Sequence, residues 1–212
     1  MPLQNRVDPC GDIHAVPDRG MFTGNRGIIH DPATKTLLKR RWSTRAWIIC
    51  VCEFPGRRRE VMGARNNPKG GVGWTELFFL DEVTALAAGH RPCFYCRREA
   101  AKEFAGRFGD VFRLVEPKVA QIDSRLHSER LASGGSRRPV DTLETLPDGA
   151  MVESGGQAYA LKRGTLLPWS FEGYGPPLPF SSAAEPMLIT PPATVAILHA
   201  RFRPVWHGSA RA

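Results

Sequence analysis

The stretch of sequence that decides the fold is FLDEVTALAAGHRPCFYCRR, residues 79–98. Asp81 is a typical N-cap residue and Gly89 is typical of the position just past a helix, so a short helix is expected between them. The helix is followed by Cys93-Phe-Tyr-Cys96, in which two thiolates three residues apart can reach one ion if the backbone turns tightly. The stretch therefore predicts a metal site directly after a short helix.

A tetrahedral zinc site needs four ligands, and Cys50 and Cys52 form the second candidate pair. Both fall in an apolar run expected to be a strand, where residues i and i+2 share a face. Their Cα atoms would lie about 6.5 Å apart, whereas two sulfurs on one zinc lie about 3.8 Å apart. Three outcomes therefore remain open: both bind after a bend, one binds while the other packs as a small apolar side chain, or neither binds. The predicted zinc ligands are Cys93, Cys96, Cys50 and Cys52, and Cys10 is a spare candidate.

Residues 85–97, ALAAGHRPCFYCR, resemble the segment ALAAG-aromatic-RPC-x-x-C of the metal-binding domain of the Ada DNA-alkylation repair proteins, over about residues 79–98. The whole chain also resembles a group of bacterial proteins that carry this block. The Ada resemblance implies that Cys93 and Cys96 are zinc ligands, and that another ligand cysteine accepts a methyl group from a DNA phosphotriester. It does not extend to Cys50 and Cys52, which have one residue between them where the Ada family has three.

Length and composition set broad limits. The 212 residues suit one domain or two small ones. The longest apolar run, residues 46–52, is far shorter than the roughly 20 residues of a membrane span. The N-terminus lacks the basic-then-apolar pattern of a secretory signal, so we expect a cytoplasmic protein with reduced thiols. In that compartment a Cys-x-x-Cys pair is more typical of a metal or redox motif than of a structural disulfide.

The net charge of +8 is concentrated in one region of the chain. Residues 35–65 hold nine lysines and arginines against two glutamates, a local charge of +7. Concentrated positive charge suits a polyanion such as DNA or RNA, because neutralised phosphates release counterions. A solvated basic face is the alternative interpretation. The candidate nucleic-acid contacts are Arg40, Arg41, Arg57, Arg58, Arg59, Arg97 and Arg98.

The pattern along the chain predicts an α+β fold with a small antiparallel β-meander and helices around the cysteine site, followed by a β-rich part. Proline and glycine indicate an irregular arm over 1–35 with one short strand near 26–30, and strands are expected at 36–42, 46–54 and 58–62. Further helices are expected over 96–108 and 118–132. Together with the Ada resemblance, these elements predict an Ada-like metal-binding domain over 36–132.

A linker is expected over 133–140, and the periodicity changes after it. Short strands at 150–153, 157–162, 166–170 and 187–190, with glycine and proline turns between them, indicate a β-rich subdomain over 141–212. A short terminal helix is expected over 194–201.

The function favoured by the sequence is that of a zinc-stabilised, nucleic-acid-associated protein. One alternative is an Ada-like enzyme in which zinc-bound Cys50 or Cys52 accepts a methyl group. Another is a metal-stabilised module that binds a ligand or a protein. The sequence has no phosphate-binding loop, dinucleotide fingerprint, nucleophile elbow or His-Glu-x-x-His motif, so whether the chain is an enzyme stays open.

Overall fold

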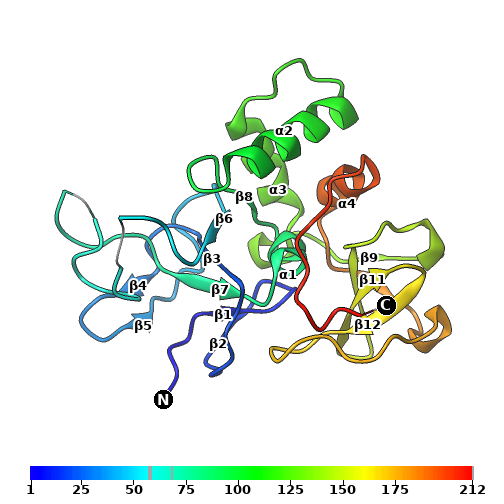
Figure 1. The fold of residues 1–212 in the computed structure, drawn as a ribbon, viewed down its shortest axis with the longest axis horizontal. Helices are drawn as coiled ribbons and strands as arrows, with labels where there is room; N and C mark the ends of the chain where they lie inside the picture. Colours follow the sequence, from blue (N-terminus) through cyan, green and yellow to red (C-terminus); the bar gives the residue numbers. More distant parts are fainter. Residues whose placement is uncertain (57–58, 68, 212) are drawn as a thin grey trace.

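The structure, a computed structural model, describes residues 1–56, 59–67 and 69–211 (Figure 1). Within these residues a six-stranded sheet, a five-stranded sheet and a two-stranded ribbon combine with four α-helices. The predicted α+β class, with a β-rich C-terminal part, is therefore confirmed.

The larger sheet has the strand order β2-β1-β7-β3-β6-β8. Its central strand β3 is antiparallel to both of its neighbours, β6 and β7. Two pairs are parallel, β1 with β7 and β6 with β8. The strands are β1 (Arg6–Val7), β2 (Ile13–His14), β3 (Phe22–Asn25), β6 (Ile48–Val51), β7 (Leu77–Phe79) and β8 (Arg91–Pro92).

The strands expected to form a consecutive meander have other partners. β5 (Thr36–Leu37) pairs with β4 (His30–Asp31) in the separate ribbon. β6 pairs with β3, from the segment expected to be an irregular arm, and with β8. Among the described residues of 58–62 no strand forms. Gly24 explains the pairing of β3 with β6, because a Cβ there would lie 2.2 Å from the carbonyl oxygen of Ile48.

The first helix follows the sequence prediction closely. α1 (Glu82–Ala87) has Asp81 as its N-cap, and the carboxylate accepts a hydrogen bond from the backbone N–H of Thr84. Gly89 follows the helix with φ +81°, and a Cβ there would lie 2.6 Å from the Cβ of Arg130. Glycine thus both ends the helix and makes room for a neighbouring side chain.

The second helix begins and ends at other residues than the sequence predicts. α2 (Arg98–Phe112) begins after Cys96 and continues through Gly109, whose missing side chain leaves room for the carbonyl of Leu114. Arg113, with φ +54°, ends it. The remaining helices are α3 (Val119–Glu129) and α4 (Pro192–His199), with 3₁₀ turns η1 (Leu131–Ser133), η2 (Leu143–Thr145) and η3 (Phe180–Ser182).

The C-terminal sheet has the strand order β12-β11-β10-β13-β9 and is antiparallel throughout. Four of its strands match the expected ones, and the fifth, β9, comes from the segment expected to be a linker. The strands are β9 (Arg138–Pro139), β10 (Met151–Ser154), β11 (Gln157–Lys162), β12 (Thr165–Pro168) and β13 (Met187–Leu188).

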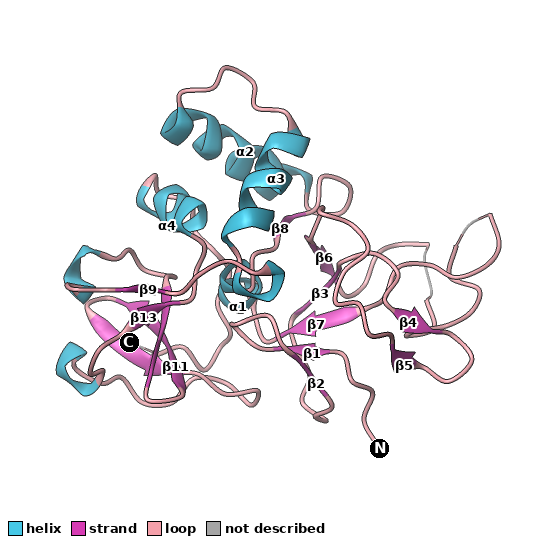
Figure 2. Cartoon of the chain, turned by 180° about the vertical axis from the view of Figure 1, so that it is seen from behind, coloured by secondary structure: helices cyan, strands magenta, loops and turns pink. Residues whose placement is uncertain are grey.

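Helix α1 lies between the two large sheets (Figure 1), and the view from behind agrees (Figure 2). Its residue Leu86 belongs to the apolar cluster under the larger sheet, whereas Val83 belongs to the cluster under the C-terminal sheet. The N-cap carboxylate of Asp81 also accepts hydrogen bonds from the hydroxyl of Tyr174 and the backbone N–H of His207, each at 3.0 Å. One buried helix thus joins the two halves. No helix in the described part of the chain is long and apolar enough to cross a membrane.

Candidate metal centre

Three cysteines converge at one end of the larger sheet. The Sγ atoms of Cys50, Cys93 and Cys96 all lie within 4.8 Å of one another. Cys50 lies in β6 and Cys93 directly follows β8, so the parallel pairing of these strands sets the two side by side. The backbone N–H of Cys93 donates to the carbonyl of Ile49 at 3.0 Å and extends the ladder. This spacing fits sulfurs around one tetrahedral ion, where they lie about 3.8 Å apart.

The turn between Cys93 and Cys96 is held by backbone hydrogen bonds. The N–H of Tyr95 donates to the Sγ of Cys93 at 3.4 Å, and the N–H of Arg97 donates to the carbonyl of Cys93 at 3.0 Å. Hydrogen bonds from the thiols of Cys50 and Cys96 lower the pKa of Cys93 well below the ordinary range of a thiol. The three thiols are close enough to hydrogen-bond to one another. A metal ion that binds them takes the place of their protons, because cysteine binds a metal as the thiolate.

A buried ion pair fixes the strand that leads into this turn. Arg91 of β8 donates from Nε and Nη2 to the two carboxylate oxygens of Asp123 in α3, at 2.7 and 2.9 Å. Both side chains are buried. Arg91 also donates from Nη1 to the carbonyl of Pro92, the residue before Cys93. The arrangement is bidentate, which restricts geometry more than a single contact does, so α3 holds the Cys93 segment in place.

Cys52 lies outside the group of three. It is exposed, and its thiol contacts the carbonyl oxygens of Met21 at 3.4 Å and Gly20 at 3.9 Å. β6 ends at Val51 and the chain bends at Cys52. Residues i and i+2 share a face only within a strand, so Cys52 does not have to lie on the same face as Cys50. Of the three outcomes considered for the Cys50–Cys52 pair, the structure brings one cysteine, Cys50, to the site. Cys10 lies apart, and burial raises its pKa to about 11.

The chain supplies three ligand side chains to this group. In the described ranges no histidine, aspartate, glutamate or further cysteine joins them. Arg57, Arg58, Pro68 and Ala212, which lie outside those ranges, have no side chain of a type that zinc uses. A tetrahedral ion held here would have three protein ligands and one open position, the arrangement of catalytic rather than closed structural zinc sites.

A cavity of about 300 Å³ opens beside the three cysteines, and all three line it. Most of the other residues that line the cavity are apolar or aromatic. The rings of Phe54 and Tyr95 lie 5.2 Å apart, and the guanidinium of Arg59 lies over the ring of Trp74 at 3.9 Å. The rest of the lining consists of Thr23, Ile48, Val51, Cys52, Val61, Glu76 and Phe78.

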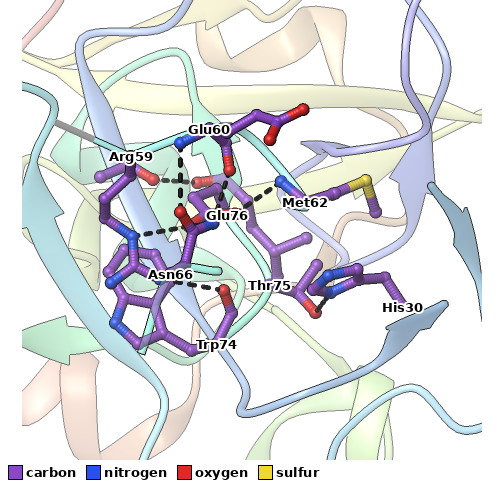
Figure 3. Close-up of polar contacts among 10 residues, drawn as sticks. His30, Arg59, Glu60, Met62, Asn66, Trp74, Thr75 and Glu76 are labelled. Atoms are coloured by element: carbon purple, nitrogen blue, oxygen red, sulfur yellow. Dashed lines mark hydrogen bonds and ion pairs between the residues drawn. The ribbon is translucent and has the colours of Figure 1, made fainter. Parts of the chain in front are cut away.

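One buried carboxylate holds the loop that forms this wall (Figure 3). Glu76, one residue before β7, accepts hydrogen bonds from Arg59 Nε at 2.7 Å, Asn66 Nδ2 at 3.3 Å and the backbone N–H of Met62 at 2.8 Å. Asn66 in turn bonds both the N–H and the carbonyl of Glu60. The described residues near 59–66 are therefore ordered by side-chain hydrogen bonds instead of the strand pairing expected there.

The seven arginines predicted to contact nucleic acid fall into three groups. Arg40, Arg41 and Arg98 are exposed. Arg59 pairs with Glu76, and Arg97 pairs with Glu82 at 2.6 Å while its guanidinium lies 4.5 Å from the ring of Phe22. Arg57 and Arg58 lie outside the described residues. Two of the seven are therefore engaged inside the protein.

The amino-acid sequence alone does not single out Asp123, Glu76 or the cavity. Asp123 lies on an amphipathic helix where an acidic residue is ordinary, and Glu76 lies next to a short strand, so neither carries a local signal. The indirect signal is charge: an arginine that becomes buried needs compensating partners, and a carboxylate is one of them.

Comparison with protein families, with curated proteins and with solved structures gives no match. The class of the protein is therefore defined by its own geometry. It is an α+β protein with a three-cysteine site, Cys50, Cys93 and Cys96, that could hold a metal ion.

Proposed function

We propose that this chain is a zinc protein that binds a ligand at the metal. Cys50, Cys93 and Cys96 are the protein ligands, and the fourth position opens toward the cavity. The observation that supports this proposal is that all three cysteines line the cavity while no fourth ligand joins them in the described residues. Thiolate donors favour zinc, copper(I) and iron–sulfur clusters, and the Ada resemblance at Cys93 and Cys96 favours zinc among these. When bound, the ion supplies a Lewis-acidic site that activates what it coordinates.

Metal content tests this proposal. Purified wild-type protein is expected to contain one zinc per chain by elemental analysis, and Cys93→Ser is expected to lose it. Cys50→Ser and Cys96→Ser should behave like Cys93→Ser, because each removes one of three thiolates.

The matched control is Cys52→Ser, which changes an exposed cysteine two residues from Cys50 that lies outside the group. It is expected to keep its zinc. Well-folded wild-type protein without metal, or equal loss from Cys52→Ser, would show the proposal to be wrong.

A second candidate function is association with DNA or RNA. Arg40 and Arg41 are adjacent and exposed, and Arg98 is exposed at the start of α2. Among the described residues none of the three has a carboxylate partner within salt-bridge distance. Unpaired exposed guanidinium groups are available to phosphates.

The methyl-accepting reaction implied by the Ada resemblance stays a prediction. Of its two candidate acceptors, Cys50 belongs to the three-cysteine group and Cys52 lines the cavity beside it.

Salt dependence tests the second candidate. The double variant Arg40→Ala/Arg41→Ala is expected to bind duplex DNA or RNA more weakly, and the slope of log affinity against log salt should fall by about two. The control, Arg201→Ala/Arg203→Ala, removes the same charge from two other exposed arginines. Equal losses in the two double variants would mean that binding follows net charge alone and that no defined surface exists.

A further inference from the structure

The three cysteines line one cavity, through which a donor from outside the chain can approach them. Cys50 and Cys93 are 7% and 8% exposed, and both line the cavity together with half-buried Cys96. A molecule that completes the coordination of the metal must therefore fit the cavity as well as the ion. At about 300 Å³ the cavity is at the lower end of ligand-pocket sizes, so the molecule is small.

The chemistry of the three protein donors favours a soft fourth donor. Thiolates select soft and borderline metals, and such metals in turn prefer sulfur to oxygen. Four aromatic residues, Phe54, Trp74, Phe78 and Tyr95, line the same cavity as the cysteines. A sulfur atom beside aromatic rings makes favourable contacts, whereas a water molecule or hydroxyl there has few polar neighbours.

The charged residues of the described lining, Arg59 and Glu76, do not favour an anionic body. Arg59 is the one basic residue in the described lining, and it is engaged by Glu76 and by the ring of Trp74. Among the described residues that line the cavity, a phosphate or carboxylate would find no unpaired positive charge. A thiolate bound to the metal needs no basic residue, because the positive metal ion itself compensates its negative charge. The N–H of Tyr95, which donates to the Sγ of Cys93, and the N-terminal end of α2, two residues after Cys96, stabilise negative charge on the sulfurs.

We propose that the open position takes the thiolate of a small thiol whose apolar or aromatic body occupies the cavity. This proposal rests on the proposed function, since it needs the metal. The thiol loses its proton to solvent, its sulfur bonds the metal, and a water molecule leaves the fourth position. Nothing is oxidised or reduced, and no group is transferred between molecules.

Cobalt(II)-substituted protein in anaerobic buffer provides the test, because each added thiolate raises the sulfur-to-cobalt charge-transfer absorbance. The probe is phenylmethanethiol. Two comparison compounds test separately the need for a sulfur donor and the need for an apolar body. Phenylmethanol has the same body with an oxygen donor, and 2-mercaptoethanol has a sulfur donor with a small polar body. Phenylmethanethiol is expected to raise the absorbance to saturation with a half-saturation at least tenfold below that of 2-mercaptoethanol. Phenylmethanol is expected to give no change.

Trp74→Ala removes one ring from the wall without touching a sulfur, and it is expected to raise the half-saturation for phenylmethanethiol about tenfold while leaving that for 2-mercaptoethanol unchanged. Phe54→Ala is a second wall variant with the same expected direction. The matched control is Trp42→Ala, because Trp42 packs on Trp47 and His127 and does not line the cavity.

Cobalt-loaded protein that gives no response to phenylmethanethiol, responds equally to both thiols, or loses its metal to them would overturn this proposal while the metal site itself stood. Wild-type protein that binds neither zinc nor cobalt would overturn the proposed function and this inference together.

Discussion

Replacing Cys93 with serine is expected to lower the free energy of unfolding by about 4 kcal/mol in zinc-containing buffer. An ion that binds the native state alone stabilises it by this amount when free metal is about a thousandfold above its dissociation constant. The unfolded chain cannot match the site, because Cys50 and Cys93 are brought together only by the pairing of β6 with β8. For a chain of this length the midpoint of thermal unfolding should fall by roughly 8 to 16 °C.

Two comparisons separate metal loss from the substitution itself. Cys52→Ser, outside the group, is expected to unfold like the wild type. A chelator should lower the wild-type midpoint to that of Cys93→Ser and leave the variant unchanged, since the same ion cannot be lost twice. A chelator that destabilises both proteins equally would place the stabilising metal elsewhere.

The part of the site that the sequence predicts correctly is local. Asp81, Gly89 and the turn from Cys93 to Cys96 depend on residues within a few positions of one another, so capping and spacing rules suffice. Cys50 is predicted together with Cys52, and the sequence leaves open whether both, one or neither binds, because the position of Cys50 depends on a parallel pairing between β6 and β8. No turn connects these strands, so nothing in the sequence between them specifies their register.

The centre of the larger sheet carries little sequence signal. β3 has the sequence Phe-Thr-Gly-Asn, with no alternation of apolar and polar residues, and all four residues are buried. It lies at the centre because Gly24 allows β6 to approach, and because the Thr23 hydroxyl donates to the carbonyl of Leu77. A segment rich in glycine and proline was therefore expected to be irregular and instead supplies the middle strand.

Part of the positive charge of the chain does not lie on its surface, because some arginines are buried. Arg26 and Arg130 are buried, and their guanidinium groups lie 3.9 and 3.5 Å from the ring of Trp47. Arg130 donates to the carbonyls of Gly89 and Arg45. Composition cannot separate such arginines from exposed ones. The net charge of +8 therefore includes groups that hold the core together, and a nucleic-acid surface must be built from exposed residues such as Arg40 and Arg41.

The second large effect is expected for Asp123→Ala, which should lower the free energy of unfolding by about 3–5 kcal/mol, measured by denaturant unfolding. Removing one partner of a buried pair leaves the other charge buried without compensation. Arg91 is 5% exposed, and both of its bonds to Asp123 would be lost. Glu99→Ala is the control, because its pair with Lys102 is exposed and such pairs contribute at most about 1 kcal/mol.

The same variant separates a purely structural role from a positioning role. Arg91 lies two residues before Cys93 and bonds the carbonyl of Pro92, so a displaced Arg91 should move the Cys93 turn and weaken the binding of zinc. Arg91→Met/Asp123→Leu replaces the pair with apolar side chains and is expected to recover most of the stability. If this double variant also recovers full zinc affinity, the pair acts through stability alone. If it folds well but binds zinc at least tenfold more weakly, the bidentate pair positions the ligand, and this is the result we expect.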